Sequence, residues 1–305
     1  MWSSKWQTCR QLFVTGIMMA SLAAAAPQIS MSAPTNSAVA SQVSTRPATA
    51  SAAPTGAIDM VNPSQPPPKD KVMRFGMVLF PGYEPLDVMG PLQILFRLSM
   101  SHPATLSVIA SKAGPISALP NDPYVVGKAI AAPQMVATHS FADAPDLDVL
   151  LVPGGWGIFN NLENNDTSIE DFVKARYPKL QYLLSVCTGA TSLARAGVLD
   201  GKKATTNKMA WKEVTEQGPA VNWVASARWV EDGNIWTSSG VAAGIDMAYA
   251  FFKKVFGTEK LNRVMDAMEY APHTDPSYDP FAVLFKVPGA NETAGDNCAI
   301  PLGML

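Results

Sequence analysis

Residues 183–190 read Leu-Leu-Ser-Val-Cys-Thr-Gly-Ala, and this stretch decides the fold. The apolar run from Tyr182 to Val186 predicts a buried strand, and Thr188 to Ala196 predicts the helix after it. Cys187 stands at the tight bend between them, where Gly189 lets a neighbouring backbone approach closely. Because a helix amino terminus favours thiolate over thiol, Cys187 is a candidate nucleophile. The alternative is a small buried core residue.

The same strand-then-helix pattern extends on both sides of this stretch. Further strands are expected over Arg74–Phe80, Thr105–Ala110 and Leu147–Val152. Helices are expected over Leu86–Leu98, Ile169–Arg176, Ala242–Phe256 and Glu259–Tyr270. An Asp-Gly turn predicts a hairpin of Arg228–Val230 with Asn234–Thr237, and Ile116–Leu119 with Val125–Ile130 is expected to form a hairpin or edge pair. The alternation predicts an α/β fold with an open, mostly parallel sheet, in which ligands bind beyond the carboxyl ends of the strands.

Composition excludes several classes of protein. The 305 residues carry 23 Lys plus Arg against 25 Asp plus Glu, a net charge of −2, so a basic face for nucleic acid is not expected. Three cysteines cannot build a disulfide scaffold, and the absence of a Cys-x-x-Cys or Cys/His cluster predicts no metal and no other cofactor. No apolar run reaches about 18 residues, which excludes a multi-span membrane protein.

The chain divides into four parts by composition. Residues 1–26 have the basic start, short apolar block and small residues of a secretory signal. A mitochondrial transit peptide is one alternative, because no acidic residue precedes Asp59, and retention in the cell is the other. Residues 27–70 form a disordered linker rich in Ser, Thr, Pro and Ala, residues 71–286 form one domain, and residues 287–305 form a tail. We therefore expect a secreted protein with no membrane segment in its mature form.

Secretion bears on the thiols and on glycosylation. Cleavage near Ala26 would leave Cys187 and Cys298 as the cysteines of the mature chain. We predict that Cys187 stays a free thiol, because a strand-to-helix bend beneath covering loops admits a small substrate more readily than a second backbone. The sequons that begin at Asn165 and Asn291 are compatible with a glycoprotein.

Two other loops follow strand ends and carry candidate site residues. The segment Pro81 to Pro91 contains Glu84 and Asp87, and Asp87 lies among apolar residues at the start of a helix. Asp87 either caps that helix or faces something polar. Glu84 is the alternative carboxylate and is expected to be exposed. The pair Gly154–Gly155 offers backbone N–H groups for a developing negative charge, and the adjacent Trp156 is expected to line the substrate pocket.

Five ordered motifs within about residues 73 to 272 resemble one family. They are Phe-Pro-Gly with an Asp three positions before Gly-Pro, Asp-Val-Leu-Leu-Val-Pro-Gly-Gly, Ser-Val-Cys-Thr-Gly-Ala, Gly-Lys-Lys-Ala-Thr-Thr and Thr-Ser-Ser-Gly-Val-Ala-Ala-Gly-Ile-Asp. Together they resemble the DJ-1/PfpI superfamily, and most of all its isonitrile hydratase subgroup. The resemblance implies a flavodoxin-like sandwich, similar to class I glutamine amidotransferases, that is usually a homodimer. It also implies Cys187 as nucleophile on the elbow, Asp87 as its carboxylate partner, Thr188 as the residue after the nucleophile and Gly155 as an oxyanion-type donor.

The departures from the family pattern restrict the chemistry. Protease-like members place His directly after the nucleophile, where this chain has Thr188. Glutamine amidotransferases need a distant His, and none occurs here between His139 and His273. Both activities therefore lose their general base. Isonitrile hydratases tend to show Thr-Thr-His-Trp, where this chain has Asn207-Lys208 as the last two residues. His273 itself is expected in a solvated loop.

The remaining chemistry suits a small-molecule substrate. An isonitrile carbon needs a soft nucleophile and an acid close together, which Cys187 and Asp87 supply. Attack gives a thioimidate, water adds, and an N-substituted formamide leaves. Asp87 must be protonated at one step and anionic at another, which a raised pKa allows. Gly155, Trp156 and Asn207 are the expected substrate-binding residues. The alternatives are a glyoxalase-type or stress-protective protein acting on reactive aldehydes, and a binding module without turnover.

Overall fold

The computed structural model of the chain describes residues 72–120 and 132–291. Their main sheet has seven strands in the order β10-β11-β7-β6-β1-β2-β5, and only the β10–β11 pair is antiparallel. The strands are β1 (Met73–Val78), β2 (Ala104–Ala110), β5 (His139–Ser140), β6 (Val149–Val152), β7 (Tyr182–Ser185), β10 (Trp229–Asp232) and β11 (Ile235–Ser238). The predicted α/β fold with a mostly parallel sheet is confirmed.

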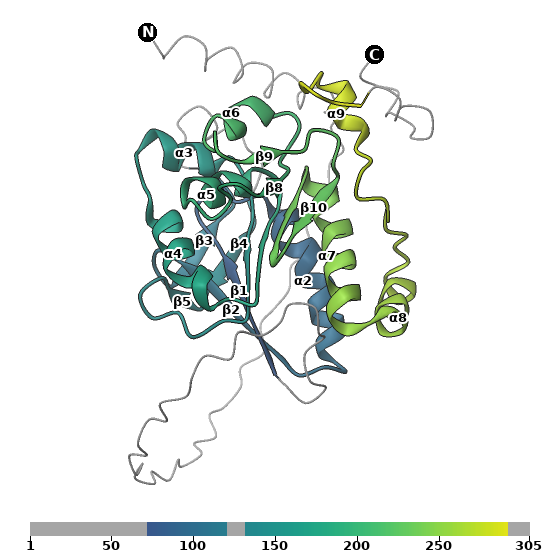
Figure 1. The fold of residues 1–305 in the computed structure, drawn as a ribbon. Coiled ribbons are helices and arrows are strands. Elements are labelled where there is room, and N and C mark those ends of the chain that lie inside the picture. The colour runs from purple at the N-terminus through teal and green to yellow at the C-terminus, as the bar shows by residue number, and fades with distance from the viewer. Residues whose placement is uncertain (1–71, 121–131, 292–305) are drawn as a thin grey trace, which may run out of the picture. The chain divides into compact units, whose positions relative to one another are not determined.

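Helices cover both faces of the sheet (Figure 1). On one face, α2 (Pro85–Ser99) packs against α7 (Val241–Phe256) and α8 (Thr258–Met268). The other side carries α3 (Gly157–Glu163), α4 (Ser168–Arg176) and α5 (Ala190–Arg195). The short helices α6 (Trp211–Thr215) and α9 (Pro280–Leu284) and the 3₁₀ turns η1 (Tyr177–Lys179) and η2 (Cys187–Gly189) complete the helical elements of the described residues.

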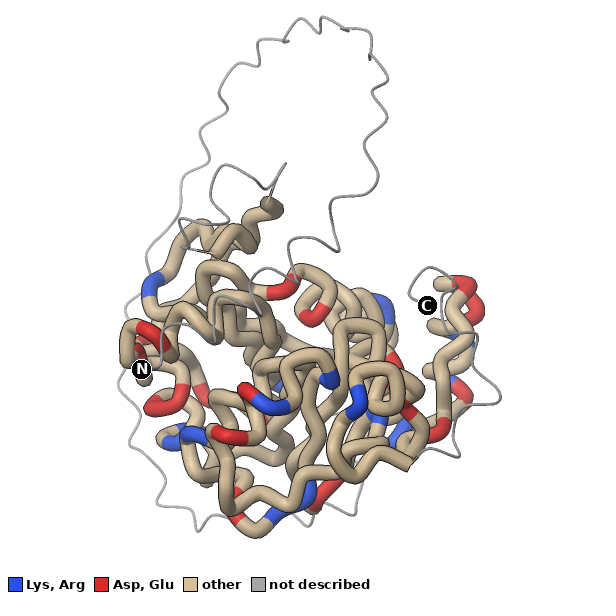
Figure 2. Tube along the Cα trace, turned by 90° about the horizontal axis from the view of Figure 1, so that it is seen from above, with Lys and Arg blue, Asp and Glu red and all other residues tan. Residues whose placement is uncertain are grey.

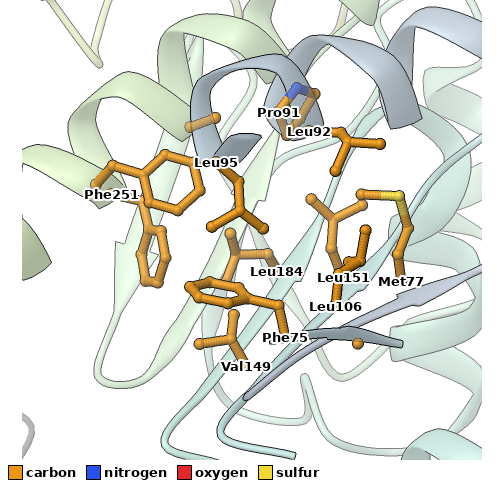
Figure 3. A pocket seen from close by; sticks show the side chains of 13 residues that line it. Phe75, Met77, Pro91, Leu92, Leu95, Leu106, Val149, Leu151, Leu184 and Phe251 are labelled. Atoms are coloured by element: carbon orange, nitrogen blue, oxygen red, sulfur yellow. The ribbon is translucent and has the colours of Figure 1, made fainter. Parts of the chain in front are cut away.

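Central strands are buried on both faces, which explains their continuous apolar runs. Every residue of β6 and β7 is buried, and so are the last four of β1. Such strands lack the polar alternation of a sheet with one wet face. Between this sheet and helices α2 and α7 the packing leaves an apolar cavity of about 20 Å³ (Figure 3). Leu95, Leu184 and Phe251 are among the side chains around it.

The sequence placed the long elements well and the short ones poorly. The strand over Gly114–Ser117 (β3) does pair antiparallel, but its partner is β4 (Gln134–Ala137). The expected partner Val125–Ile130 lies outside the described residues. The helices α3, α6 and α9 and the small parallel pair of β8 (Lys203–Ala204) with β9 (Asn222–Trp223) were not predicted, because elements this short have no measurable hydrophobic period.

Charged residues of both signs are interspersed along the described domain (Figure 2). Lys202 and Lys254 pair with Asp232 and Glu231. Among the described residues no helix is long and apolar enough to cross a membrane. The predicted signal 1–26, the linker 27–70 and Cys298 of the tail lie outside the described residues.

Candidate active site

Three loops meet at the carboxyl ends of three neighbouring strands. The strands β7, β6 and β1 are adjacent in the sheet. From β1 the chain continues to β2 on one side of β1, and it later returns to form β6 on the other side. Such a change of direction opens a crevice for ligands in parallel sheets. The segments that follow these strands carry Asp87 in the first turn of α2, Gly154 in a loop and Cys187 in the turn η2. Hydrogen bonds join the Gly154–Gly155 loop to Asp87 and to Thr188.

Cys187 occupies a strained elbow. Its φ of +57° is a left-handed conformation that non-glycine residues rarely adopt. Its N–H donates to the Ser239 carbonyl at 2.9 Å, and its own carbonyl accepts from Thr206 Oγ1 at 2.9 Å. A Cβ on Gly189 would lie 2.4 Å from the Val152 carbonyl oxygen, so glycine is required for the close approach. These contacts hold a thiol that is only 6% exposed.

Asp87 faces the Gly154 loop and does not cap its own helix. Its Oδ2 accepts from the Gly154 N–H at 2.8 Å, whereas the N-cap of α2 is Glu84, without a side-chain cap bond. The Asp87 side chain is fully buried, and its Oδ1 has no hydrogen-bond partner among the described residues. Burial raises the pKa of Asp87 from 3.8 to about 8, opposed by the Gly154 hydrogen bond and reinforced by the charge of Glu84. With this pKa the carboxyl group of Asp87 is mostly neutral at pH 7.

The sulfur of Cys187 rests as a thiol, which corrects the expected effect of the helix terminus. Burial raises the pKa of Cys187 well above its ordinary value, and the negative charges that Asp87 and Glu84 carry once ionised raise it further. Hydrogen bonds from the Thr188 N–H and the Asn207 amide lower this pKa by less. The elbow continues as the three-residue turn η2 and the six-residue helix α5, too little helix to outweigh burial. Cys187 is a free thiol in the described part of the chain.

Asn207 is brought directly onto the sulfur. Its Nδ2 donates to Cys187 Sγ at 3.1 Å, and its Oδ1 accepts from the Ala210 N–H at 3.1 Å. The second bond fixes the amide so that its donor side faces the sulfur. A residue that stood out as a departure from the family pattern thus touches the proposed nucleophile.

Thr188 and Gly155 are bonded to each other. The Gly155 N–H, expected as an oxyanion-type donor, gives its hydrogen bond to Thr188 Oγ1 at 3.0 Å. A Cβ on Gly154 would lie 2.6 Å from the Thr188 N and 2.9 Å from Cys187 Cβ, so this loop lies against the elbow. Trp156 is half-buried at the start of α3, with its ring edge-to-face against Phe159 at 6.1 Å.

Of the two weaker candidates, Glu84 differs from the expectation and His273 agrees with it. Glu84 is partly buried, not exposed, because its N–H bonds to the Gly154 carbonyl at 2.8 Å and holds the turn against the neighbouring loop. Burial also raises the pKa of Glu84. His273 is exposed, as expected for a solvated loop. Within residues 72–120 and 132–291 no group of three or more His, Cys, Asp or Glu is arranged to hold a metal.

Sequence reasoning missed one buried charged pair beside the site. Lys208 and Asp279 are almost completely buried, with Nζ 3.9 Å from Oδ2. Lys208 follows Asn207, so it lies within the segment that contacts the sulfur. The signal in the sequence was faint: Trp211 at helical spacing from Lys208, and an Asp before Pro280 typical of a helix N-cap.

Comparison with known proteins gives the chain its relatives. The sequence profile of the DJ-1/PfpI family matches residues 73–254, more than half of the chain. The chain is 32% identical over 200 residues to isonitrile hydratase of Pseudomonas putida, covering 66% of this chain and 79% of that protein. It is 28% identical over 123 residues to protein DJ-1alpha of Drosophila melanogaster, covering 40% of this chain and 55% of that protein.

A solved structure shows the same arrangement of elements. The crystal structure of a ThiJ/PfpI family protein from Pseudomonas syringae superposes with a TM-score of 0.57 at 26% sequence identity. The match covers 74% of this chain and 86% of that one.

Proposed function

The chain belongs to the DJ-1/PfpI family, and on that premise we propose that it adds water to an isonitrile and releases an N-substituted formamide. The observation that carries the proposal is the pairing of a buried thiol with a buried carboxyl group that is neutral at pH 7. An isonitrile carbon accepts a proton and a soft nucleophile together. Cys187 supplies the nucleophile and Asp87 the proton.

The first step forms the carbon–sulfur bond. Asp87 gives its proton to the terminal carbon of the isonitrile while the sulfur of Cys187 attacks that carbon. The thiol proton passes to the carboxylate, so Asp87 ends the step neutral again, and the product is a thioimidate. The Asn207 amide stabilises the negative charge that develops on the sulfur, since its Nδ2 lies 3.1 Å from Sγ.

The second step consumes water. Its oxygen bonds to the former isonitrile carbon, one water proton passes through Asp87 to the nitrogen, and a tetrahedral adduct forms. Collapse of the adduct makes the formyl C=O bond and breaks the C–S bond. The hydroxyl proton returns to the sulfur. Both residues recover their starting protonation states, as a catalyst requires.

Burial of the thiol favours a slender substrate. With 6% of Cys187 exposed, the reacting atom must arrive through a narrow opening. The terminal carbon of an isonitrile carries no substituent and lies on a linear R–N–C axis. It can reach the sulfur while the bulk of the molecule stays outside. Glu84 and Trp156, both partly buried beside the Gly154 loop, are the side chains we assign to the entrance.

A paired assay tests the proposal. Purified protein is given an aromatic isonitrile and, separately, methylglyoxal, with formamide and lactate as the measured products. We expect formamide, and Cys187→Ala should abolish it, whereas Asp266→Asn, an exposed carboxylate on α8, should leave it unchanged. Lactate without formamide would assign the protein to the glyoxalase-type alternative. If neither formamide nor lactate forms, the result favours a binding module without turnover. Wild-type turnover by the Cys187→Ala variant would refute the nucleophile.

We also propose that the chain forms a homodimer through the outer face of α2. The exposed residues of this face carry no charge: they are Leu86, Met89, Gln93, Phe96 and Ser99, followed by Met100. A second copy can lie on such a face without opposing like charges. Light scattering should therefore give a dimer for the wild type and a monomer for Phe96→Lys. Val136→Lys, at an exposed apolar residue on β4, should remain dimeric.

A further inference from the structure

We propose that Lys208 and Asp279 are positioning residues that hold the Asn207 amide on the Cys187 sulfur. Through them the C-terminal segment 276–287 becomes part of the active site. This inference rests on the proposed function only in taking Cys187 as the reactive group.

Lys208 closes the loop that carries Asn207. Its side chain is 1% exposed, and its Nζ donates to Thr205 Oγ1 at 2.6 Å and to the Ala227 carbonyl at 2.8 Å. The ammonium also lies 4.9 Å from the centre of the Trp211 ring, within cation–π range. The bond back to Thr205 ties the two ends of the segment 205–208 together.

The segment 205–208 makes two hydrogen bonds to Cys187. Thr206 Oγ1 bonds the Cys187 carbonyl, and Asn207 Nδ2 bonds the sulfur. At the start of the loop, the Thr205 N–H donates to Thr237 Oγ1 at 2.9 Å. A side chain presented from a loop keeps its geometry only while the loop is fixed at both ends. Lys208 supplies the fixing at the far end.

Asp279 supplies the charge that keeps Lys208 in place. Its side chain is 1% exposed, and it caps α9 by accepting from the Phe281 N–H through Oδ1 while Oδ2 faces the ammonium. A buried ammonium without a carboxylate is strongly unfavourable, so the position of Lys208 depends on Asp279.

The C-terminal segment is anchored independently of this ion pair. The Pro276 carbonyl accepts from the Arg228 N–H at 2.8 Å, and Ala282 and Val287 pack against Trp211. The family profile ends at residue 254, so the partner of Lys208 comes from beyond the matched region. Asp279, which lies outside the matched region, therefore contacts Lys208, the residue next to Asn207. The Asn207 amide is the group that touches the Cys187 sulfur.

Alkylation of Cys187 tests the inference without any substrate. The rate of reaction with iodoacetamide at pH 7 is followed by peptide mass in the full chain. Asn207→Ala removes the hydrogen bond to the developing thiolate, and we expect about a tenfold slower rate, equivalent to about 1.4 kcal/mol. Lys208→Met should slow the rate similarly. The double variant should be no slower than Asn207→Ala alone, because Lys208 acts through Asn207. The carboxyl groups that face Cys187, Asp87 and Glu84, are unchanged in all three proteins.

Asp279→Asn removes the negative charge that faces Lys208 while it keeps a side chain able to cap α9. Asparagine caps helices as well as aspartate does, so α9 should persist while the ion pair is lost. We expect slower alkylation in this variant and the wild-type rate in Asp275→Asn, an exposed carboxylate directly before the segment 276–287. A wild-type rate in Lys208→Met, or effects of Lys208→Met and Asn207→Ala that multiply, would overturn the inference.

Melting temperatures separate an effect on alkylation from a loss of folding. Removing one partner of a buried pair destabilises a protein, whereas removing both is much less costly. Lys208→Met combined with Asp279→Asn should therefore regain much of the melting temperature but keep the slow alkylation. Recovery of both together would mean that the pair acts on stability alone, and would refute the positioning role. Absence of isonitrile turnover with these alkylation rates would refute the proposed function and leave this inference intact.

Discussion

Replacing Asp87 with Asn should change how the stability of the protein depends on pH. The folded state raises the pKa of Asp87 from 3.8 to about 8, so between these values the folded protein keeps a proton that the unfolded chain releases. Raising the pH through this window therefore favours the unfolded state. Asparagine mimics the neutral carboxyl group and has no proton to lose, so its variant lacks this contribution.

The magnitude follows from the two pKa values. Each pH unit inside the window costs the wild type about 1.4 kcal/mol of unfolding free energy. Between pH 5 and pH 7 the wild type should therefore lose about 3 kcal/mol relative to Asp87→Asn. Glu170, another buried carboxyl group, is common to both proteins and cancels in the difference.

Urea unfolding at pH 5, 6 and 7 measures this difference, with reductant present to keep Cys187 reduced. Asp266→Asn, at an exposed position on α8, is the control and should follow the wild type at every pH. Turnover of Asp87→Asn should fall by about 10² to 10⁴, the usual contribution of a positioned acid. A wild-type-minus-variant difference that stays constant between pH 5 and pH 7 would mean that Asp87 is already ionised, and would refute its role as acid.

Three further outcomes are expected. Gly154→Ala should slow turnover and destabilise the domain by about 1 to 3 kcal/mol, because the new Cβ would lie 2.6 Å from the Thr188 N and 2.9 Å from Cys187 Cβ; unchanged activity would mean that the loop can move aside. Leu184→Ala should cost about 2 to 5 kcal/mol in urea unfolding because it enlarges an existing cavity, and a loss below 1 kcal/mol would mean that the surrounding helices collapse into it. We also propose that the protein is secreted with residues 1–26 removed. The intact mass of protein from culture medium, alkylated unfolded without reductant, should then show two modified cysteines, whereas none would indicate a Cys187–Cys298 disulfide.

The sequence by itself determined the class of fold and the candidate pair, Cys187 and Asp87. Long apolar runs at Arg74–Phe80 and Leu147–Val152 have few ways to be buried other than in the middle of a parallel sheet. Because the ends of such strands meet at one edge, the residues that follow them had to converge. Cys187 and Asp87 could therefore both be placed at this edge from their positions in the chain, whereas their pairing came from the resemblance to the DJ-1/PfpI family.

Tertiary structure alone decided the states of those groups. The expectation of a thiolate at Cys187 came from local geometry, whereas its raised pKa comes from burial and from carboxylates about 100 residues away in the sequence. The exchange of hydrogen bonds between Thr188 and Gly155 likewise depends on the distance between two loops. The hydrophobic periodicity of the sequence does not indicate the distance between two loops.

Lys208 marks the limit most clearly. A lysine beside a short helix is usually solvated, and Trp211, three residues after Lys208, is only a faint indication of burial. It is buried because Asp279, 71 residues further along the chain, returns with the C-terminal segment to face it. Hydrophobic pattern is a property of neighbouring residues and can be taken from the sequence, but the burial of a single charge depends on a partner that only the folded chain supplies.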